Sequence, residues 1–155
     1  MSTTLLYDAV SKPASQFTEA LAQNAASAMY NLPFGPPVGT RRFLIRALQV
    51  LTNENYGPQL NFFATAAGRT ADPATNTFLA PFGFVSSMGY QLGGAGVWYY
   101  YIDGMAIPYF DGDTIGTQTP PSLHVVLQNI SPTAKSAYPT DSTKVTAWLE
   151  PVQTY

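Results

Sequence analysis

The sequence predicts an all-β protein, in which an antiparallel β-sandwich or jelly-roll-like domain over residues 41–155 follows an extended N-terminal arm over residues 1–40. Two observations predict the sandwich. Segments rich in aromatic and β-branched residues recur after residue 41, and Gly, Pro, Asn and Asp separate them at short intervals. A third observation concerns the surface, because only 10% of the residues are charged, against roughly 25% in ordinary soluble domains.

The arm is predicted from a change in composition. Residues 1–40 are poor in charge and rich in Ala, Ser and Gln, and they end in the proline-rich segment 32–39. Proline fixes φ and lacks a backbone donor, so this segment should be extended. Phe17, Leu21, Ala25 and Met29 recur at helical spacing and favour a short helix over 16–29. An extended strap across a neighbouring subunit is the alternative for the same residues.

The segment 42–51 fits two structures. Arg42 and Arg46 fall on one helical face and Leu44, Leu48 and Leu51 on the opposite one, so periodicity favours a helix. The flanking prolines and the turn-forming residues at 55–58 instead favour a strand of hairpin length leading into the next apolar segment. We favour the strand.

The middle of the chain should hold three further strands, over 60–65, 78–85 and 97–102, all rich in residues that strands prefer. Asp103-Gly104 and Asp111-Gly112 suit the positive-φ positions of tight hairpin turns, which predicts a meander over 97–118. Pro108 lies within its middle segment and confines that segment to an edge, a bulge or a short irregular strand.

The last two predicted strands show clear alternation, over 123–128 and 144–150. Leu123, Val125 and Leu127 should face the core from the first of them. In the second, the small and apolar positions 145, 147 and 149 should face inward and the positions between them outward.

Composition excludes several classes of protein. A chain of 16.7 kDa is the size of one domain, and its net charge of −2 provides no basic surface for nucleic acid. No apolar run approaches the roughly 20 residues needed to cross a bilayer. The first residues lack the basic and apolar regions of a signal peptide, so we expect synthesis in a cytoplasm. The absence of cysteine excludes disulfides and thiolate chemistry.

Catalytic motifs are weak. His124 is the only histidine, so a site that needs several histidines is excluded and a structural role is expected for it. Asp103, Asp111 and Asp113 could bind calcium or hydrolyse a glycoside, but turn formation already accounts for two of them. We therefore expect no enzyme, no cofactor and no bound metal, and keep hydrolysis by Asp111 or Asp113 as a remote third possibility.

The uncharged stretch is the strongest functional signal. Residues 73–102 contain no charged side chain, and charge depletion is typical of the buried centre of subunit interfaces. The densest aromatic group spans 98–101, where consecutive residues must face both sides of a strand. One side should lie in the core and the other should be covered by a partner. A subunit is favoured over a sugar, because sugar sites also need polar and charged groups.

The arm exit at 32–39, the aromatic strand 97–102 with its Asp-Gly turns and the strand 145–149 resemble the small cement or decoration proteins of tailed-bacteriophage capsids. This resemblance implies a structural virion protein on the capsid surface, a homotrimer that clamps the major capsid protein without catalysis. Candidate contacts with the shell or with other subunits are Leu5, Leu6, Tyr7, Phe17, Phe34, Trp98, Tyr100 and Tyr109. The alternative is a carbohydrate- or receptor-binding β-module of a phage fibre or spike. If residues 1–31 form an arm, their deletion should leave a folded β-domain.

Overall fold

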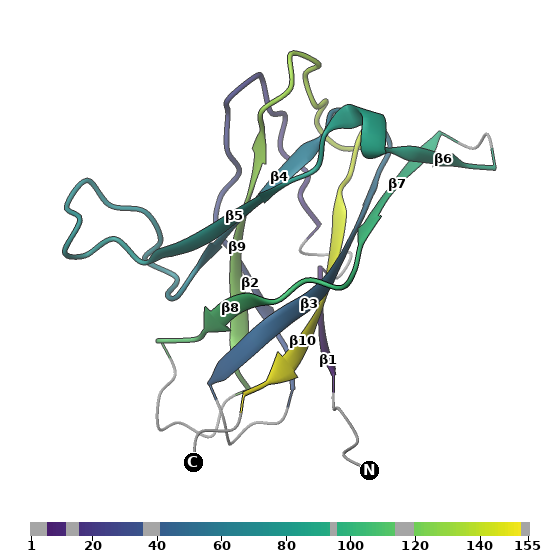
Figure 1. Ribbon diagram of the computed structural model, residues 1–155. Helices are drawn as coiled ribbons and strands as arrows, with labels where there is room; N and C mark the ends of the chain where they lie inside the picture. The colour runs from purple at the N-terminus through teal and green to yellow at the C-terminus, as the bar shows by residue number, and fades with distance from the viewer. Residues whose placement is uncertain (1–5, 12–15, 36–40, 94–95, 114–119, 153–155) are drawn as a thin grey trace, which may run out of the picture.

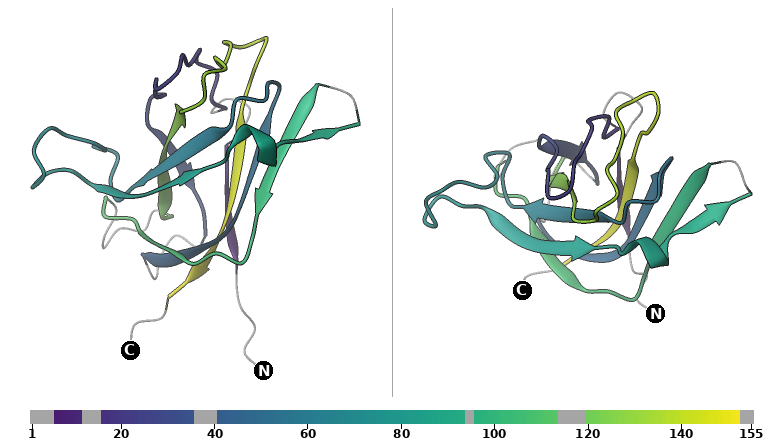
Figure 2. Two further views of the ribbon diagram at one scale, coloured as in Figure 1. Left: turned by 45° about the horizontal axis from the view of Figure 1, so that its top comes forward. Right: turned by 90° about the horizontal axis from the view of Figure 1, so that it is seen from above.

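The protein folds as two antiparallel β-sheets packed face to face, which confirms the predicted β-sandwich (Figure 1). The structure is a computed structural model that describes residues 6–11, 16–35, 41–93, 96–113 and 120–152. The β6–β7 hairpin and the loop that joins β4 to β5 project from opposite sides of the sandwich (Figures 1 and 2).

The larger sheet has six strands. Five follow the order β1-β10-β3-β7-β6. The sixth, β8, pairs with the first residues of β3, on the same edge of β3 as β7. Their bounds are β1 Tyr7–Val10, β3 Arg42–Thr52, β6 Tyr90–Leu92, β7 Val97–Ile102, β8 Ile107–Phe110 and β10 Lys144–Pro151. The smaller sheet has the order β2-β9-β4-β5, with β2 at Tyr30–Pro33, β4 at Pro58–Phe63, β5 at Phe78–Gly83 and β9 at Ser122–Asn129. A short 3₁₀ turn, η2, spans Ser86–Met88.

The pairing of the strands is that of a jelly roll. With β6 and β8 set aside, eight strands remain, and the first pairs with the last, the second with the seventh, the third with the sixth and the fourth with the fifth. A long antiparallel ribbon of this kind rolls up into two sheets once β3 also pairs with β10 and β4 with β9. Here β6 and β8 extend the larger sheet.

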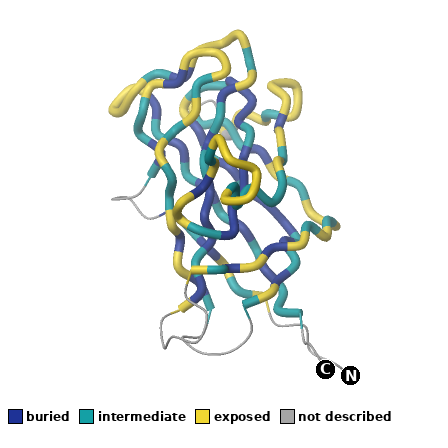
Figure 3. Tube along the Cα trace, turned by 90° about the vertical axis from the view of Figure 1, so that its left-hand side faces the viewer, coloured by how far each residue is buried: buried dark blue, intermediate teal, exposed yellow. Residues whose placement is uncertain are grey.

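The core lies between the sheets and contains the inward positions of both (Figure 3). Leu123, Val125 and Leu127 of β9 are fully buried, as are Val145, Ala147 and Leu149 of β10, so both predicted alternations are confirmed. The ambiguous segment at 42–51 is a strand, β3, because it pairs with β10 along one edge and with β7 and β8 along the other.

The predicted helix over 16–29 is wrong. This segment runs extended beside residues 128–143, with bridges from Phe17 to Thr143 and from Leu21 to Lys135. The backbone amide of Leu21 donates to Lys135 O, and that of Lys135 donates to Leu21 O, both at 2.9 Å. These backbone groups satisfy each other between the two neighbouring segments, so Phe17 and Leu21 are buried without a helix, while Ala25 and Met29 are only partly buried.

The separate arm is also corrected. Strand β1 forms one edge of the larger sheet beside β10, and β2 forms one edge of the smaller sheet beside β9. The described residues before 41 therefore belong to the sandwich. A deletion of residues 1–31 would remove β1 and part of β2, so it should unfold the domain rather than release an arm.

The predicted meander over 97–118 is wrong in its pairing. Strands β7 and β8 do not pair with each other, because both pair with β3, β7 along residues 48–52 and β8 along 42–45. Gly104 has a φ of +69°, but its turn joins two consecutive strands on the same side of β3. Pro108 lies in the four-residue edge strand β8, as its missing amide requires.

Within the described residues, no helix has the length and apolar character needed to cross a membrane.

Candidate interaction surface

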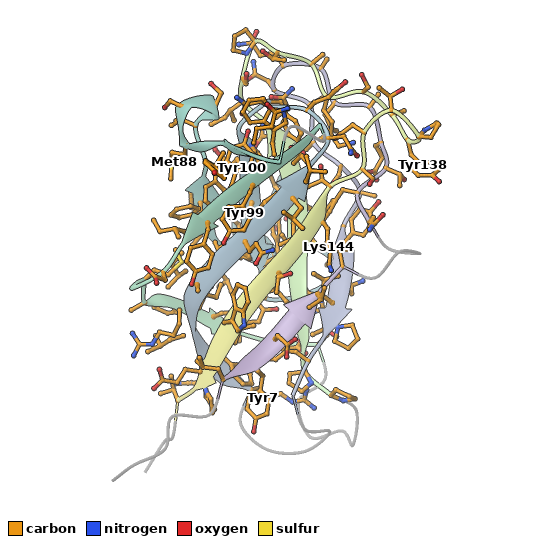
Figure 4. All side chains as sticks on the ribbon, turned by 90° about the vertical axis from the view of Figure 1, so that its right-hand side faces the viewer. Tyr7, Met88, Tyr99, Tyr100, Tyr138 and Lys144 are labelled. Atoms are coloured by element: carbon orange, nitrogen blue, oxygen red, sulfur yellow. The ribbon has the colours of Figure 1, made fainter. Side chains whose placement is uncertain are left out.

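The outer face of the larger sheet carries a group of four aromatic rings, of which Tyr90 and Tyr101 are exposed. In β7, Tyr100 points into the core and is fully buried, so Tyr99 and Tyr101 point outward. Tyr90 of β6 lies directly opposite Tyr99 and is 65% exposed. Trp148 of β10 faces outward between the buried Ala147 and Leu149. We call Tyr90, Tyr99, Tyr101 and Trp148 the aromatic band; Figure 4 looks onto this face of the sheet and labels Tyr99.

Within the band, the Tyr101 ring contacts the rings of Tyr99 and Trp148. Tyr99 and Tyr101 have centroids 6.0 Å apart and planes 14° from parallel. The Trp148 ring meets Tyr101 edge-on, with centroids 6.2 Å apart. Tyr101 is 43% exposed despite these contacts. This ring packing restricts Tyr99, Tyr101 and Trp148, so these side chains would lose little conformational entropy when a partner covers the band.

The charges around the band lie at its margins. Gln49 of β3 and Thr146 of β10 lie opposite each other and face outward, and neither side chain is charged. Lys144 lies near one end of β10, and Arg46 pairs with Glu150 at 2.6 Å near the other end. Loss of solvation and the negative charge of Asp103 raise the pKa of Tyr101. An aromatic centre with a charged margin is the usual composition of a protein interface.

A second set of exposed apolar residues lies at one end of the sandwich, at η2 and in the loop between β9 and β10. Val85, Met88, Ile130 and Tyr138 are each at least 40% exposed, and Figure 4 places Met88 and Tyr138 at the end opposite Tyr7. A pocket of about 210 Å³ between Phe84 and Ile130 adjoins this group. The larger pocket, about 460 Å³, lies beside β8 and is mostly apolar. Both extend the apolar surface beyond the band.

Four of the predicted contact residues are core residues. Phe17, Phe34, Tyr100 and Tyr109 are between 0 and 4% exposed, so in this conformation they are not available to a partner, and their prediction as contacts is corrected. The Tyr100 hydroxyl donates to Asn55, and the Tyr109 hydroxyl donates to Ser122 O at 2.5 Å. These internal partners explain how a phenol can be buried in the core.

The other predicted contact residues differ in how far they are exposed. Leu6 is 49% exposed beside β1, and Trp98 is partly buried against the core. The ring of Tyr7 is partly buried and packs close to Gly35. Leu5 lies outside the described residues. Tyr90 and Trp148, which the sequence analysis did not select, complete the surface together with the outward tyrosines of β7.

Of the three aspartates considered for chemistry, Asp103 lies beside Tyr101 of the band, and the other two lie elsewhere. Asp111 and Asp113 follow β8 and come close to His124 of β9. No local sequence pattern groups these three residues, because 11 positions separate Asp113 from His124.

No model of a known protein family matches the chain, and no curated protein sequence is significantly similar to it. Function must therefore be inferred from the fold and from the surface.

Proposed function

We propose that the chain is a structural virion protein that decorates and stabilises a viral capsid through non-covalent contacts. It acts as a homotrimer bound to the major capsid protein. The aromatic band is the observation that carries this proposal, because it places four aromatic rings on the outer face of a sheet. In the trimer, the band is the surface buried between subunits.

The energetics of the band support assembly. Burial of apolar surface contributes about 25 cal/mol per Å², and a face with few charges is covered without the cost of removing ions from water. Aromatic residues also dominate the energy of many interfaces. A shell presents the same contact many times, so a trimer binds it through several weak contacts at once.

The jelly roll is compatible with this role. The same architecture occurs in viral capsid domains and in lectin domains, so the fold alone does not choose between a structural and a sugar-binding protein. Here it supports the proposal only by analogy, and the aromatic band is the more specific support.

Cosedimentation with capsid shells tests the proposal. The shells are assembled from the major capsid protein of the same virus, without the decorating chain. Wild-type protein should bind at a fixed ratio, and the Tyr90→Ser/Tyr101→Ser variant should bind at least tenfold more weakly, because a monomer loses the multiple contacts of a trimer. Tyr138→Ser removes an exposed tyrosine, 64% accessible, outside the band and should bind normally. Failure of wild-type protein to bind shells would overturn the proposal.

Carbohydrate binding is the second candidate. The nearly parallel rings of Tyr99 and Tyr101 favour it, since sugars stack on aromatic rings, and Gln49 lies opposite Tyr101 as a hydrogen-bonding group. A glycan array distinguishes the two functions. Binding of a defined glycan that Tyr101→Ser abolishes, with the native mass unchanged, would support the sugar site and assign the band to a ligand rather than to a subunit.

A further inference from the structure

Three side chains that can bind a metal converge at one end of the sandwich. His124 Nε2 lies 3.0 Å from Asp111 Oδ1 and 3.5 Å from Asp113 Oδ2. One ligand atom from each residue lies within 4.8 Å of the others. Asp111 is fully buried and His124 nearly so, while the Asp113 side chain is 36% exposed. The cluster is therefore enclosed on one side and open to solvent at Asp113.

The backbone holds both carboxylates in place. Asp111 Oδ2 accepts a hydrogen bond from the Ser122 amide at 2.8 Å, and Asp111 Oδ1 accepts one from the Asp113 amide at 3.0 Å. Asp113 Oδ2 accepts one from the Ala66 amide at 2.6 Å. Arg41 also lies near, with Nη1 3.7 Å from Asp111 Oδ2, the oxygen that faces away from His124.

The other ring nitrogen of His124 determines what its Nε2 can do. His124 Nδ1 faces Asn31 Oδ1 of β2, and an amide oxygen only accepts hydrogen bonds, so Nδ1 carries the proton. His124 Nε2 is then the ring nitrogen that faces the two carboxylates, with Asp111 Oδ1 at 3.0 Å and Asp113 Oδ2 at 3.5 Å. A cation placed among these three atoms would be attracted by both carboxylates. A histidine held through Nδ1 with Nε2 free to bind is the usual arrangement of a metal ligand.

Two of the three separations between the acceptor atoms match a single small ion, and the third, between the two carboxylate oxygens, lies within 4.8 Å. Two ligands about 2.0–2.1 Å from a tetrahedral ion lie about 3.3 Å apart. The observed separations from His124 Nε2 are 3.0 and 3.5 Å, on either side of that value. One imidazole nitrogen with two carboxylates suits a divalent transition-metal ion, whereas calcium and magnesium prefer sites made of oxygen alone.

We propose that Asp111, Asp113 and His124 bind one divalent transition-metal ion of the Zn²⁺ type. Asp111 and Asp113 follow β8 of the larger sheet, and His124 belongs to β9 of the smaller sheet. The ion therefore links the two sheets at this end of the sandwich. Because the described residues supply three ligands, the exposed side at Asp113 leaves a fourth position for water. The site is independent of the aromatic band.

Titration of the full-length, chelator-treated protein tests the proposal. Zn²⁺ binding is followed by calorimetry and Co²⁺ binding by the visible absorption of the ion. Each ion should bind at one per chain, and the Co²⁺ spectrum should be that of a four-coordinate site. At a free Zn²⁺ concentration about 100 times Kd, the unfolding equilibrium should shift about 100-fold toward the folded state. Added Ca²⁺ should not compete.

Two variants make the test specific. Asp113→Asn should bind Zn²⁺ at least tenfold more weakly and still fold, because Asp113 is the most exposed ligand. Asp72→Asn makes the same change of charge in the exposed loop between β4 and β5 and should bind like wild type. Wild-type protein that binds neither ion, or an Asp113→Asn variant of unchanged affinity, would overturn the proposal.

Discussion

Replacement of Lys135 by methionine should destabilise the protein strongly, because Lys135 forms a fully buried ion pair. Its Nζ lies 3.1 Å from Asp141 Oδ2, and neither side chain is exposed to solvent. The ammonium also donates to Glu19 O at 2.8 Å and to Ser136 O at 3.0 Å. Asp141 Oδ1 accepts the amides of Asn53 and Glu54. The pair therefore joins the 16–21 segment and the β3–β4 turn to the loop before β10.

The expected loss is about 3–5 kcal/mol, since removal of one partner leaves the other charge buried and unpaired. For a chain of this size that corresponds to a fall in Tm of about 6–20 °C, at about 2–4 °C per kcal/mol. Lys135→Met keeps most of the side-chain volume, so the loss reports on the ion pair and its hydrogen bonds rather than on a cavity. Asp141→Asn added to Lys135→Met removes the unpaired charge and should recover part of the loss.

Urea denaturation followed by circular dichroism provides the free energy of unfolding, with all variants at one protein concentration because assembly would also change stability. Arg46→Met is the matched control. Arg46 pairs with Glu150 at 2.6 Å, but their side chains are 40 and 26% exposed, so its loss should cost less than about 1 kcal/mol. If Lys135→Met costs no more than Arg46→Met, the reasoning about burial is refuted.

Two further predictions concern the backbone and pH. Gly57→Ala should destabilise the protein more than Gly104→Ala. Both glycines have φ near +70°, but a Cβ at Gly57 would lie 2.8 Å from Phe84 O, whereas a Cβ at Gly104 would have no atom within 4 Å. Equal losses of Tm in the two variants would contradict this prediction. The pKa of Tyr30 is raised to about 12, mainly by burial and secondly by the hydrogen bond to Glu19. Burial also raises the pKa of Tyr56. The free energy of unfolding should therefore stay level up to about pH 10, the pKa of an unfolded tyrosine, and fall between pH 10 and 12. Tyr56→Phe should fall less steeply in denaturation series across that range, and an unchanged slope would count against the prediction.

The strands that alternate clearly could be predicted from the sequence. Val145, Ala147 and Leu149 are small or apolar at every second position, and only one strand face can bury them. The segment 42–52 fits both a strand and a helix in its local pattern, because its leucines also lie at helical spacing. Its pairing with three other strands makes it a strand. Long-range pairing of this kind is absent from a local pattern.

The part of the fold before residue 41 could not be predicted for a similar reason. Strand β1 has only four residues, and the buried Phe17 and Leu21 are held by isolated bridges to residues more than 110 positions later. Their spacing of four matches a helix by coincidence. Tertiary hydrogen bonds outweigh so weak a local preference.

The candidate surface was predicted in kind but not in its residues. An uncharged aromatic strand with one covered and one open face was expected, and β7 has that arrangement. Four consecutive aromatic residues at 98–101 do not indicate which pair faces outward, so Tyr100 was assigned to the wrong side. Trp148 joins the band only because β10 lies next to β3, which lies next to β7.

The native mass of the purified protein, measured by light scattering coupled to size exclusion at low micromolar concentration, tests whether the aromatic band is buried by assembly. Wild-type protein and Tyr138→Ser should be trimers of three 16.7 kDa chains, and Tyr90→Ser/Tyr101→Ser should be a folded monomer. A wild-type monomer, or a double variant that stays trimeric, would contradict the assignment of the band to the contact between subunits.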